Sequence, residues 1–222
     1  MRDYHLLIFD WDGTLCDSID RIVLAMHRAA QQCELPPCTD EQVRNIIGLA
    51  LPEAVRVLWP QLDEHQVEVT RSAYGEHYVQ LDQQPSPLYD GVVETLHGFK
   101  QQGYRLAVAT GKRRRGLQRA LAGCDWLEFF DQTRCADETA SKPDPLMLHE
   151  ILAALKVAPE QALMVGDASF DLLMAQRAGM DSVAVSYGAQ SVADLQACSP
   201  KLVIDHIAQL ADWLAQVQRK FN

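Results

Sequence analysis

Short runs of apolar residues recur along the chain and predict a parallel sheet. In the first run, residues 4–9, the last four residues are all apolar, which is typical of a strand buried on both faces. Similar runs follow at residues 105–109, 162–165, 182–185 and 202–204. Helical patterns alternate with them, at residues 92–102, 116–122, 146–155, 169–178 and from 207 onwards. Strands that alternate with helices indicate βαβ units, so we predict a Rossmann-like α/β core with a doubly wound parallel sheet.

One long segment, residues 16–87, interrupts this alternation. It contains no convincing strand and carries helix signals throughout, whereas Pro85-Ser86-Pro87 has the composition of a return linker. We therefore predict an all-helical cap of residues 16–87, inserted after the first strand of the sheet. The catalytic core would then be made of residues 1–15 and 88–222.

Four helices are expected within this insert. The first has apolar residues at helical spacing after Asp17 or Ser18, and we expect it to continue to Pro36. A capping-box pattern at Thr39 opens the second, which Gly48 can stop. The starts expected for the other two helices are Pro52 and Asp63.

Composition narrows the class of partner. The 222 residues are 48% apolar and 23% charged, as in ordinary globular proteins. The net charge of −10 argues against nucleic acid or an anionic membrane as the main partner, although a local cationic site still allows a small anionic substrate. No apolar run approaches the roughly 18 residues of a membrane span. The six cysteines are scattered and are expected to be reduced thiols, so a cytoplasmic location is the simplest expectation.

Candidate chemistry lies where the predicted strands end, because ligands of parallel sheets bind at the carboxyl ends of strands. Asp10 and Asp12 come directly after the first strand, and Gly13-Thr14 favours a tight turn behind them. Two carboxylates so close together repel each other, and a divalent metal ion would offset that repulsion. A D-x-D sequence alone is common on protein surfaces.

Polar residues follow other strands as well, and each has an ordinary structural alternative. Thr110-Gly111 offers a hydroxyl and a backbone N–H to an oxyanion, although Thr110 also suits a helix cap. Lys142 stands in Ser141-Lys142-Pro143-Asp144-Pro145 and by itself reads as a surface lysine. Asp167 and Asp171 form another acidic pair, which can equally begin a helix.

Together, four strand ends would present four carboxylates, one hydroxyl and one ammonium group to a single crevice. The order of these motifs resembles that of the haloacid dehalogenase superfamily: D-x-D-G-T, then a threonine after the second core strand, then Lys-Pro, then G-D-x-x-x-D. More narrowly, it is similar to the phosphatases with a helical cap after the first motif, such as phosphoglycolate phosphatase and its relatives. The resemblance covers essentially the whole chain.

This resemblance implies roles for the first acidic pair. Asp10 matches the nucleophile that attacks phosphorus to give an aspartyl-phosphate. Asp12 matches the general acid that protonates the leaving alcohol and then activates water, and its backbone carbonyl is implied as a metal ligand.

The resemblance also implies how phosphate and metal are held. Thr110, Gly111 and Lys142 match the groups that bind the phosphoryl oxygens. Asp167 matches a direct ligand of Mg²⁺. Asp171 matches an acid that supports the metal, directly or through water, or orients Lys142. Oxygen ligands of this kind suit Mg²⁺, and phosphoryl transfer depends mainly on positioning and charge stabilisation.

Other reactions of the superfamily are weighed by single residues. Asp12 disfavours carbon–halogen cleavage, which needs no acid for a leaving alcohol, and a lysine-free segment 16–87 excludes a Schiff base from the cap. Sugar phosphomutases of this type typically carry a histidine where this chain has Ile22, which disfavours that activity but leaves it as an alternative. Nucleotidase or pyrophosphatase activity stays open, as does a catalytically silent, partner-binding relative.

Basic residues outside these motifs have two readings. Lys112 and Arg113-Arg114-Arg115 would attract an anionic substrate or form a solvated face, and we favour the solvated face. Arg44 and Arg56, on either side of Gly48, are likewise expected in solvent rather than on the substrate.

The sequence thus predicts an Mg²⁺-dependent phosphomonoester hydrolase that acts on a small phosphorylated metabolite. Phosphoglycolate is the first candidate by resemblance alone. The identity of the substrate and the oligomeric state are left open by the sequence.

Overall fold

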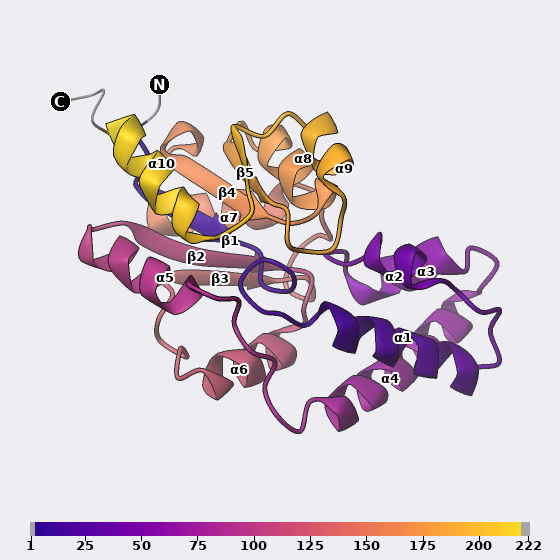
Figure 1. Cartoon of the computed structure of the whole chain (residues 1–222). Coiled ribbons are helices and arrows are strands. Elements are labelled where there is room, and N and C mark those ends of the chain that lie inside the picture. Colours follow the sequence, from indigo (N-terminus) through magenta and orange to yellow (C-terminus); the bar gives the residue numbers. More distant parts are fainter. Residues whose placement is uncertain (1–2, 219–222) are drawn as a thin grey trace.

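The computed structural model describes residues 3–218, which form a six-stranded parallel sheet with helices on both faces and a separate group of helices beside it (Figure 1). The strands are β1 (Leu6–Phe9), β2 (Arg105–Thr110), β3 (Gln132–Cys135), β4 (Ala162–Gly166), β5 (Asp181–Val185) and β6 (Leu202–Ile204). Their order in the sheet is β3-β2-β1-β4-β5-β6, and every pairing is parallel. The strand order reverses at β1, and such a switch point is where α/β sheets bind ligands.

Both faces of the sheet are buried, as the apolar runs predict. Leu7 and Phe9 face one apolar cluster, whereas Leu6 and Ile8 face the other, in agreement with the two-residue period of a strand. The helices of the core are α5 (Val92–Gln101), α6 (Arg114–Gly123), α7 (Leu146–Leu155), α8 (Ser169–Arg177), α9 (Val192–Ala197) and α10 (Ala208–Gln218). The cluster with Phe9 includes residues of α5, α6 and α10, and the cluster with Ile8 includes residues of α7 and α8.

Four further helices lie between β1 and β2 and have an apolar cluster of their own. They are α1 (Ile19–Gln32), α2 (Asp40–Arg44), α3 (Leu51–Leu58) and α4 (Glu64–Leu81). Figure 1 shows them beside the sheet, with the long helices α1 and α4 packed against each other. They form the helical cap, for which we keep residues 16–87 as the proposed extent.

Several element ends differ from those expected. Helix α1 ends at Gln32, before Pro36. Helix α2 ends at Arg44, and residues 45–48 form turns that lead up to Gly48. Strand β3 was not predicted: only its last residue, Cys135, is buried, so this edge strand lacks an apolar run. The short helix α9 was also not predicted.

The six cysteines are free thiols, as expected. Within residues 3–218, the helices fall short of the combined length and hydrophobicity that a membrane span requires.

Candidate active site

Three acidic side chains from two neighbouring strands converge at the carboxyl edge of the sheet. Asp10 follows β1 and Asp167 follows β4, the parallel neighbour in which Val165 pairs with Phe9, and Asp171 lies in the first turn of α8. One carboxylate oxygen from each lies within 4.8 Å of the others, and all three residues are buried. The structure therefore brings together three of the acids singled out in the sequence.

Asp167 is held tightly in place by its surroundings. Its Oδ1 accepts a hydrogen bond from Thr14 Oγ1 (2.8 Å), and its Oδ2 accepts one from the Ala189 N–H (2.8 Å). An added Cβ at either Gly13 or Gly188 would lie 2.2 Å from an Asp167 atom. Only glycine therefore fits at these two positions while Asp167 keeps its place.

Lys142 is the counter-charge inside this cluster. Its Nζ lies 2.6 Å from Asp171 Oδ1 and 2.8 Å from Asp10 Oδ1, and its side chain is fully buried. The other Asp171 oxygen accepts a hydrogen bond from the Ala168 N–H (3.2 Å). Despite its ion pair, Asp10 Oδ1 receives no hydrogen bond of normal geometry from the described residues. Lys142 is therefore not the surface lysine that its local sequence alone would suggest.

Burial dominates the titration of these groups. It raises the pKa of Asp10 well above its usual value, an effect that Lys142 opposes and that Asp171 and Asp167 reinforce. Burial, together with the charge of Asp171, raises the pKa of Asp167 to about 7. For Lys142, burial works against the charge, but Asp10 and Asp171 outweigh it and raise the pKa of the ammonium group.

These contacts fit a divalent metal ion. The three carboxylates outnumber the single ammonium group, so the cluster carries excess negative charge when all three acids are ionised. Carboxylate oxygens are the ligands that Mg²⁺ prefers, and Asp10 offers an oxygen without a hydrogen-bond donor. Asp10, Asp167 and Asp171 are the residues that could hold the ion, although both oxygens of Asp167 and of Asp171 also accept hydrogen bonds within the protein.

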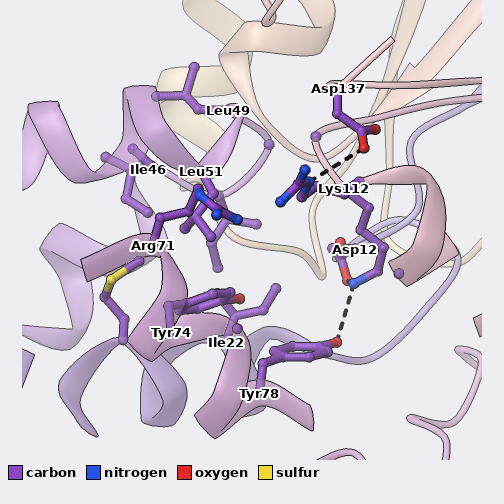
Figure 2. A pocket seen from close by; sticks show the side chains of 18 of the residues that line it. Asp12, Ile22, Ile46, Leu49, Leu51, Arg71, Tyr74, Tyr78, Lys112 and Asp137 are labelled. Atoms are coloured by element: carbon purple, nitrogen blue, oxygen red, sulfur yellow. Dashed lines mark hydrogen bonds and ion pairs between the residues drawn. The ribbon is translucent and has the colours of Figure 1, made fainter. Parts of the chain in front are cut away.

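Asp12 lies outside this cluster and has other partners. Its Oδ1 accepts a hydrogen bond from Ser18 Oγ (2.5 Å) and lies 2.8 Å from Lys112 Nζ. Lys112 in turn donates to the hydroxyl of Tyr78 on α4 (3.2 Å), so it joins a core acid to the cap (Figure 2). A metal contact through the backbone carbonyl of Asp12 stays a prediction.

The interpretation of Lys112 as part of a solvated basic face was wrong. Its ammonium group is buried, and the charge of Asp12, against the cost of burial, raises its pKa. The signal in the sequence was its position, two residues after Thr110 at the end of β2. Because β1 and β2 are parallel neighbours, a residue that follows β2 lies at the same edge of the sheet as Asp10 and Asp12.

The second motif lies directly under the cap. Thr110 is fully buried at the end of β2, and its Oγ1 accepts a hydrogen bond from the Lys112 N–H (3.2 Å). An added Cβ at Gly111 would lie 2.5 Å from the carbonyl oxygen of Gly48, so a side chain there would displace the cap loop. Nearby, the Ala50 N–H of the cap donates to Ser141 Oγ (2.9 Å).

A cavity of about 400 Å³ opens from Asp10 and Asp12 towards the cap. Helices α1, α3 and α4 and the loop around Gly48 line one side, and the start of α6 lines the other (Figure 2). Arg113 and Arg115 reach its wall. By contrast, the lining does not include Arg44 and Arg56, whose partners are the acids Asp20, Glu53 and Glu64.

Comparison with known proteins agrees with this geometry. Residues 7–185 match the family model of haloacid dehalogenase-like hydrolases. The chain belongs to this family. Among curated proteins, a phosphoglycolate phosphatase of Vibrio vulnificus (strain YJ016) is 30% identical, over 95% of this chain and 96% of the relative. A protein of Dickeya dadantii (strain 3937) named "Probable phosphatase IndB" is 34% identical, over 92% of this chain and 91% of the relative.

Solved structures support the same assignment. A predicted phosphoglycolate phosphatase from Haemophilus somnus 129PT superposes with a TM-score of 0.83 at 28% identity, covering 96% of this chain and 98% of that one. A hydrolase from Pseudomonas syringae has a TM-score of 0.87 at 22% identity, covering 95% and 98%, and supports the fold alone. This haloacid dehalogenase-like hydrolase is thus a phosphatase with an α/β core and a helical cap.

Proposed function

We propose that this phosphatase hydrolyses phosphate monoesters of small metabolites with Mg²⁺ as cofactor and Asp10 as nucleophile. One observation carries the proposal: the buried carboxylates of Asp10, Asp167 and Asp171 converge within 4.8 Å, with Lys142 between two of them. Such a cluster suits an anionic nucleophile that must approach an anionic phosphate. Bound there, Mg²⁺ would offset the repulsion between the two anions.

In the first step, an Asp10 oxygen forms a bond to phosphorus while the bond to the alcohol oxygen breaks. Asp12 gives its proton to that oxygen, and the alcohol leaves. Asp12 suits this role because it lines the cavity, where the organic part of the substrate would lie. Thr110, Gly111 and Lys142 bind the phosphoryl oxygens during the transfer.

In the second step, water releases the phosphate from Asp10. Asp12 takes a proton from the water, whose oxygen attacks phosphorus, and the bond to Asp10 breaks. The nucleophile and the protonated Asp12 are thereby regenerated, so the two steps together hydrolyse one ester. Asp171 orients Lys142 during both steps, which its 2.6 Å contact with Nζ supports.

The substrate class follows in part from the relatives. Their names make phosphoglycolate the reference substrate to test first. A cytoplasmic location, expected from the sequence, belongs to the same proposal.

The test is phosphate release from a panel of phosphomonoesters that contains phosphoglycolate, sugar phosphates and nucleotides. We expect release with Mg²⁺, none after EDTA treatment, and recovery when Mg²⁺ is added back. A phosphomutase would return an isomer without free phosphate, and a silent relative would release nothing. Hydrolysis that persists in EDTA would contradict the proposed metal.

A further inference from the structure

The cavity above Asp12 is much larger than a phosphate group requires. Its volume of about 400 Å³ falls in the range of roughly 300–1,000 Å³ that is typical of sites for drug-sized ligands. Because Asp10 and Asp12 line this cavity together with residues of the cap, the space between these acids and the cap is where the alcohol of a bound ester would extend. The residues of the cavity wall therefore indicate which kind of alcohol fits there.

Most of the wall on the cap side is aliphatic. The side chains come from α1, the loop around Gly48 and α3, and they include Ile22, Met26, Ile46, Leu49, Leu51 and Ala54. A short, charged alcohol such as glycolate would leave this surface uncovered. It would also place a carboxylate beside groups that cannot replace its water, which is unfavourable.

Two tyrosines of α4 form an aromatic part of the same wall. The rings of Tyr74 and Tyr78 lie with their centroids 5.8 Å apart and their planes 28° apart, and both side chains line the cavity (Figure 2). Lys112 fixes Tyr78 by a hydrogen bond and by its position 4.8 Å from the ring centroid. Aromatic rings held in place at a cavity wall favour a planar ligand group, which can stack on them.

Of the cations that line the cavity, all but the exposed Arg115 have an acidic partner among the described residues. Arg71 is bound by both carboxylate oxygens of Glu68, and Lys112 is bound by Asp12. Arg113 lies 3.4 Å from Asp137. A second anionic group on the substrate would have to compete with these acids, so only Arg115 is left to receive one.

We propose that the pocket takes a phosphomonoester whose alcohol carries a flat ring and is about the size of a nucleoside. The ring lies between Tyr74 and the aliphatic wall of the cap, and the phosphate lies at Asp10. This inference rests on the proposed phosphatase reaction and specifies its substrate class. It places ring-bearing esters such as nucleoside 5′-monophosphates before phosphoglycolate.

Gly75 offers a direct way to fill the space that the ring needs. It lies beside Tyr74 on α4 and lines the cavity, and an added Cβ there would meet no other atom within 4 Å. A larger side chain at Gly75 would therefore extend into the cavity without a clash at its base. Gly98 on α5 is equally open but lies outside the cavity lining, so it provides a matched control.

The first measurement compares adenosine 5′-monophosphate and uridine 5′-monophosphate with ribose 5-phosphate and phosphoglycolate. A nucleotide and ribose 5-phosphate share the same phosphate-bearing sugar carbon and differ mainly in the ring. We expect at least one nucleotide to exceed ribose 5-phosphate in kcat/KM by about tenfold or more, because stacking on an aromatic side chain contributes that much to binding. Equal values, or a preference for phosphoglycolate, would overturn the inference.

The second measurement follows the ratio of kcat/KM for nucleotide to that for ribose 5-phosphate in variants. Gly75→Leu and Tyr74→Leu should each lower this ratio about tenfold, mainly through the KM of the nucleotide, since each removes space or stacking surface for the ring. Tyr74→Phe keeps the ring and should keep the ratio, and Gly98→Leu should leave it unchanged. A ratio that Gly75→Leu does not lower would contradict the placement of the ring.

Failure of the proposed function would look different. If no ester in the panel is hydrolysed, the phosphatase proposal fails, and calorimetry with the Asp10→Asn protein tests the pocket by binding alone. Tighter binding of a nucleotide than of ribose 5-phosphate, weakened by Gly75→Leu, would support the ring site. Equal or undetectable binding of both would overturn it.

Discussion

The neighbours of Asp10 have opposing effects on its pKa. Burial and two neighbouring carboxylates raise its pKa, whereas Lys142 at 2.8 Å favours the charged form. A nucleophile has to be ionised to attack phosphorus, so the surrounding positive charge decides its reactivity. The same charge balance makes this carboxylate replaceable for folding and indispensable for the proposed reaction.

Replacing Asp10 by asparagine should therefore separate activity from stability. We expect Asp10→Asn to lower phosphate release by about a thousandfold or more, because the amide cannot act as the nucleophile. Its melting temperature should stay the same or rise, since a buried, repelled charge is removed. Asp212→Asn, at an exposed position of α10, is the control and should retain full activity. Substantial turnover by Asp10→Asn would remove Asp10 from its role.

Gly188, a residue without a side chain, fixes the position of Asp167 in the proposed metal site. Because an added Cβ at Gly188 would lie 2.2 Å from Asp167 Cβ, we expect Gly188→Ala to displace that carboxylate. The Mg²⁺ concentration for half-maximal activity should rise tenfold or more. A disturbed metal site typically loses about 10–100-fold in metal affinity. Gly98→Ala, which meets no neighbour, should leave it unchanged. An unaltered requirement in Gly188→Ala would argue against Asp167 as a ligand.

At the scale of elements, helix α4 contributes both to the stability of the helical cap and to the wall of the cavity. Its N-terminus is closed by a capping box in which Asp63 accepts a hydrogen bond from the Gln66 N–H (2.8 Å), and its middle carries Tyr74 and Tyr78. The capping box stabilises the first turn of α4, whereas the positions of the tyrosines depend on the packing of this helix against α1. Stability and substrate binding therefore depend on different parts of one helix.

Loss of the capping hydrogen bond of Asp63 should lower stability and leave activity unchanged. We expect Asp63→Ala to lower the free energy of unfolding by about 1 kcal/mol, as for other N-cap residues, while Asp63→Asn keeps it. Urea unfolding measures the effect, and kcat/KM at 25 °C should not change in either variant. An equal loss in both variants would show that charge, and not the cap hydrogen bond, is what Asp63 contributes.

At the scale of the whole molecule, the cap is seated over the edge where the strand ends meet. The Ala50 N–H donates to Ser141 Oγ, and Gly48 lies against Gly111, so cap and core meet around the acidic cluster. This seating keeps Asp10 and Asp167 away from water, and burial is the main cause of their raised pKa values. Ionisation of these buried carboxyl groups is therefore unfavourable, and a bound cation would reduce its free-energy cost.

That cost should appear in the pH dependence of stability. The pKa of Asp167 is about 7 in the folded protein, above its usual value near 4, so the folded state binds the extra proton. In EDTA, the stability from this group is present at acid pH and is lost as pH rises towards and through 7. Mg²⁺ should reduce this loss, because it stabilises the ionised acids.

Urea unfolding at pH 5, 6, 7 and 8, with EDTA or Mg²⁺, measures this dependence. Asp167→Asn, which has no proton to release, should show a weaker loss of stability in EDTA over the same range. A wild-type protein that becomes more stable in EDTA as pH rises from 5 to 8 would contradict the raised pKa of these acids.

Much of the fold and of the site was predictable from local sequence. Buried strands leave unbroken apolar runs, which identified β1, β2, β4, β5 and β6, and capping boxes marked the starts of α2 and α4. Strand β3 escaped because its first three residues, Gln132, Thr133 and Arg134, are polar, so this edge strand leaves no apolar run. Asp10, Asp167 and Asp171 were predictable as a cluster because parallel strands end at a common edge of the sheet.

By itself, the sequence determined the order of strands and helices and which acids follow the strands, since both depend on neighbours along the chain. Only the tertiary structure decided that Lys112 binds Asp12 and Tyr78 rather than solvent, because those partners lie 100 and 34 residues away along the chain. The same holds for the aliphatic and tyrosine wall above the catalytic acids. It exists only once the cap helices pack together, and packing is a property of surfaces that meet in space.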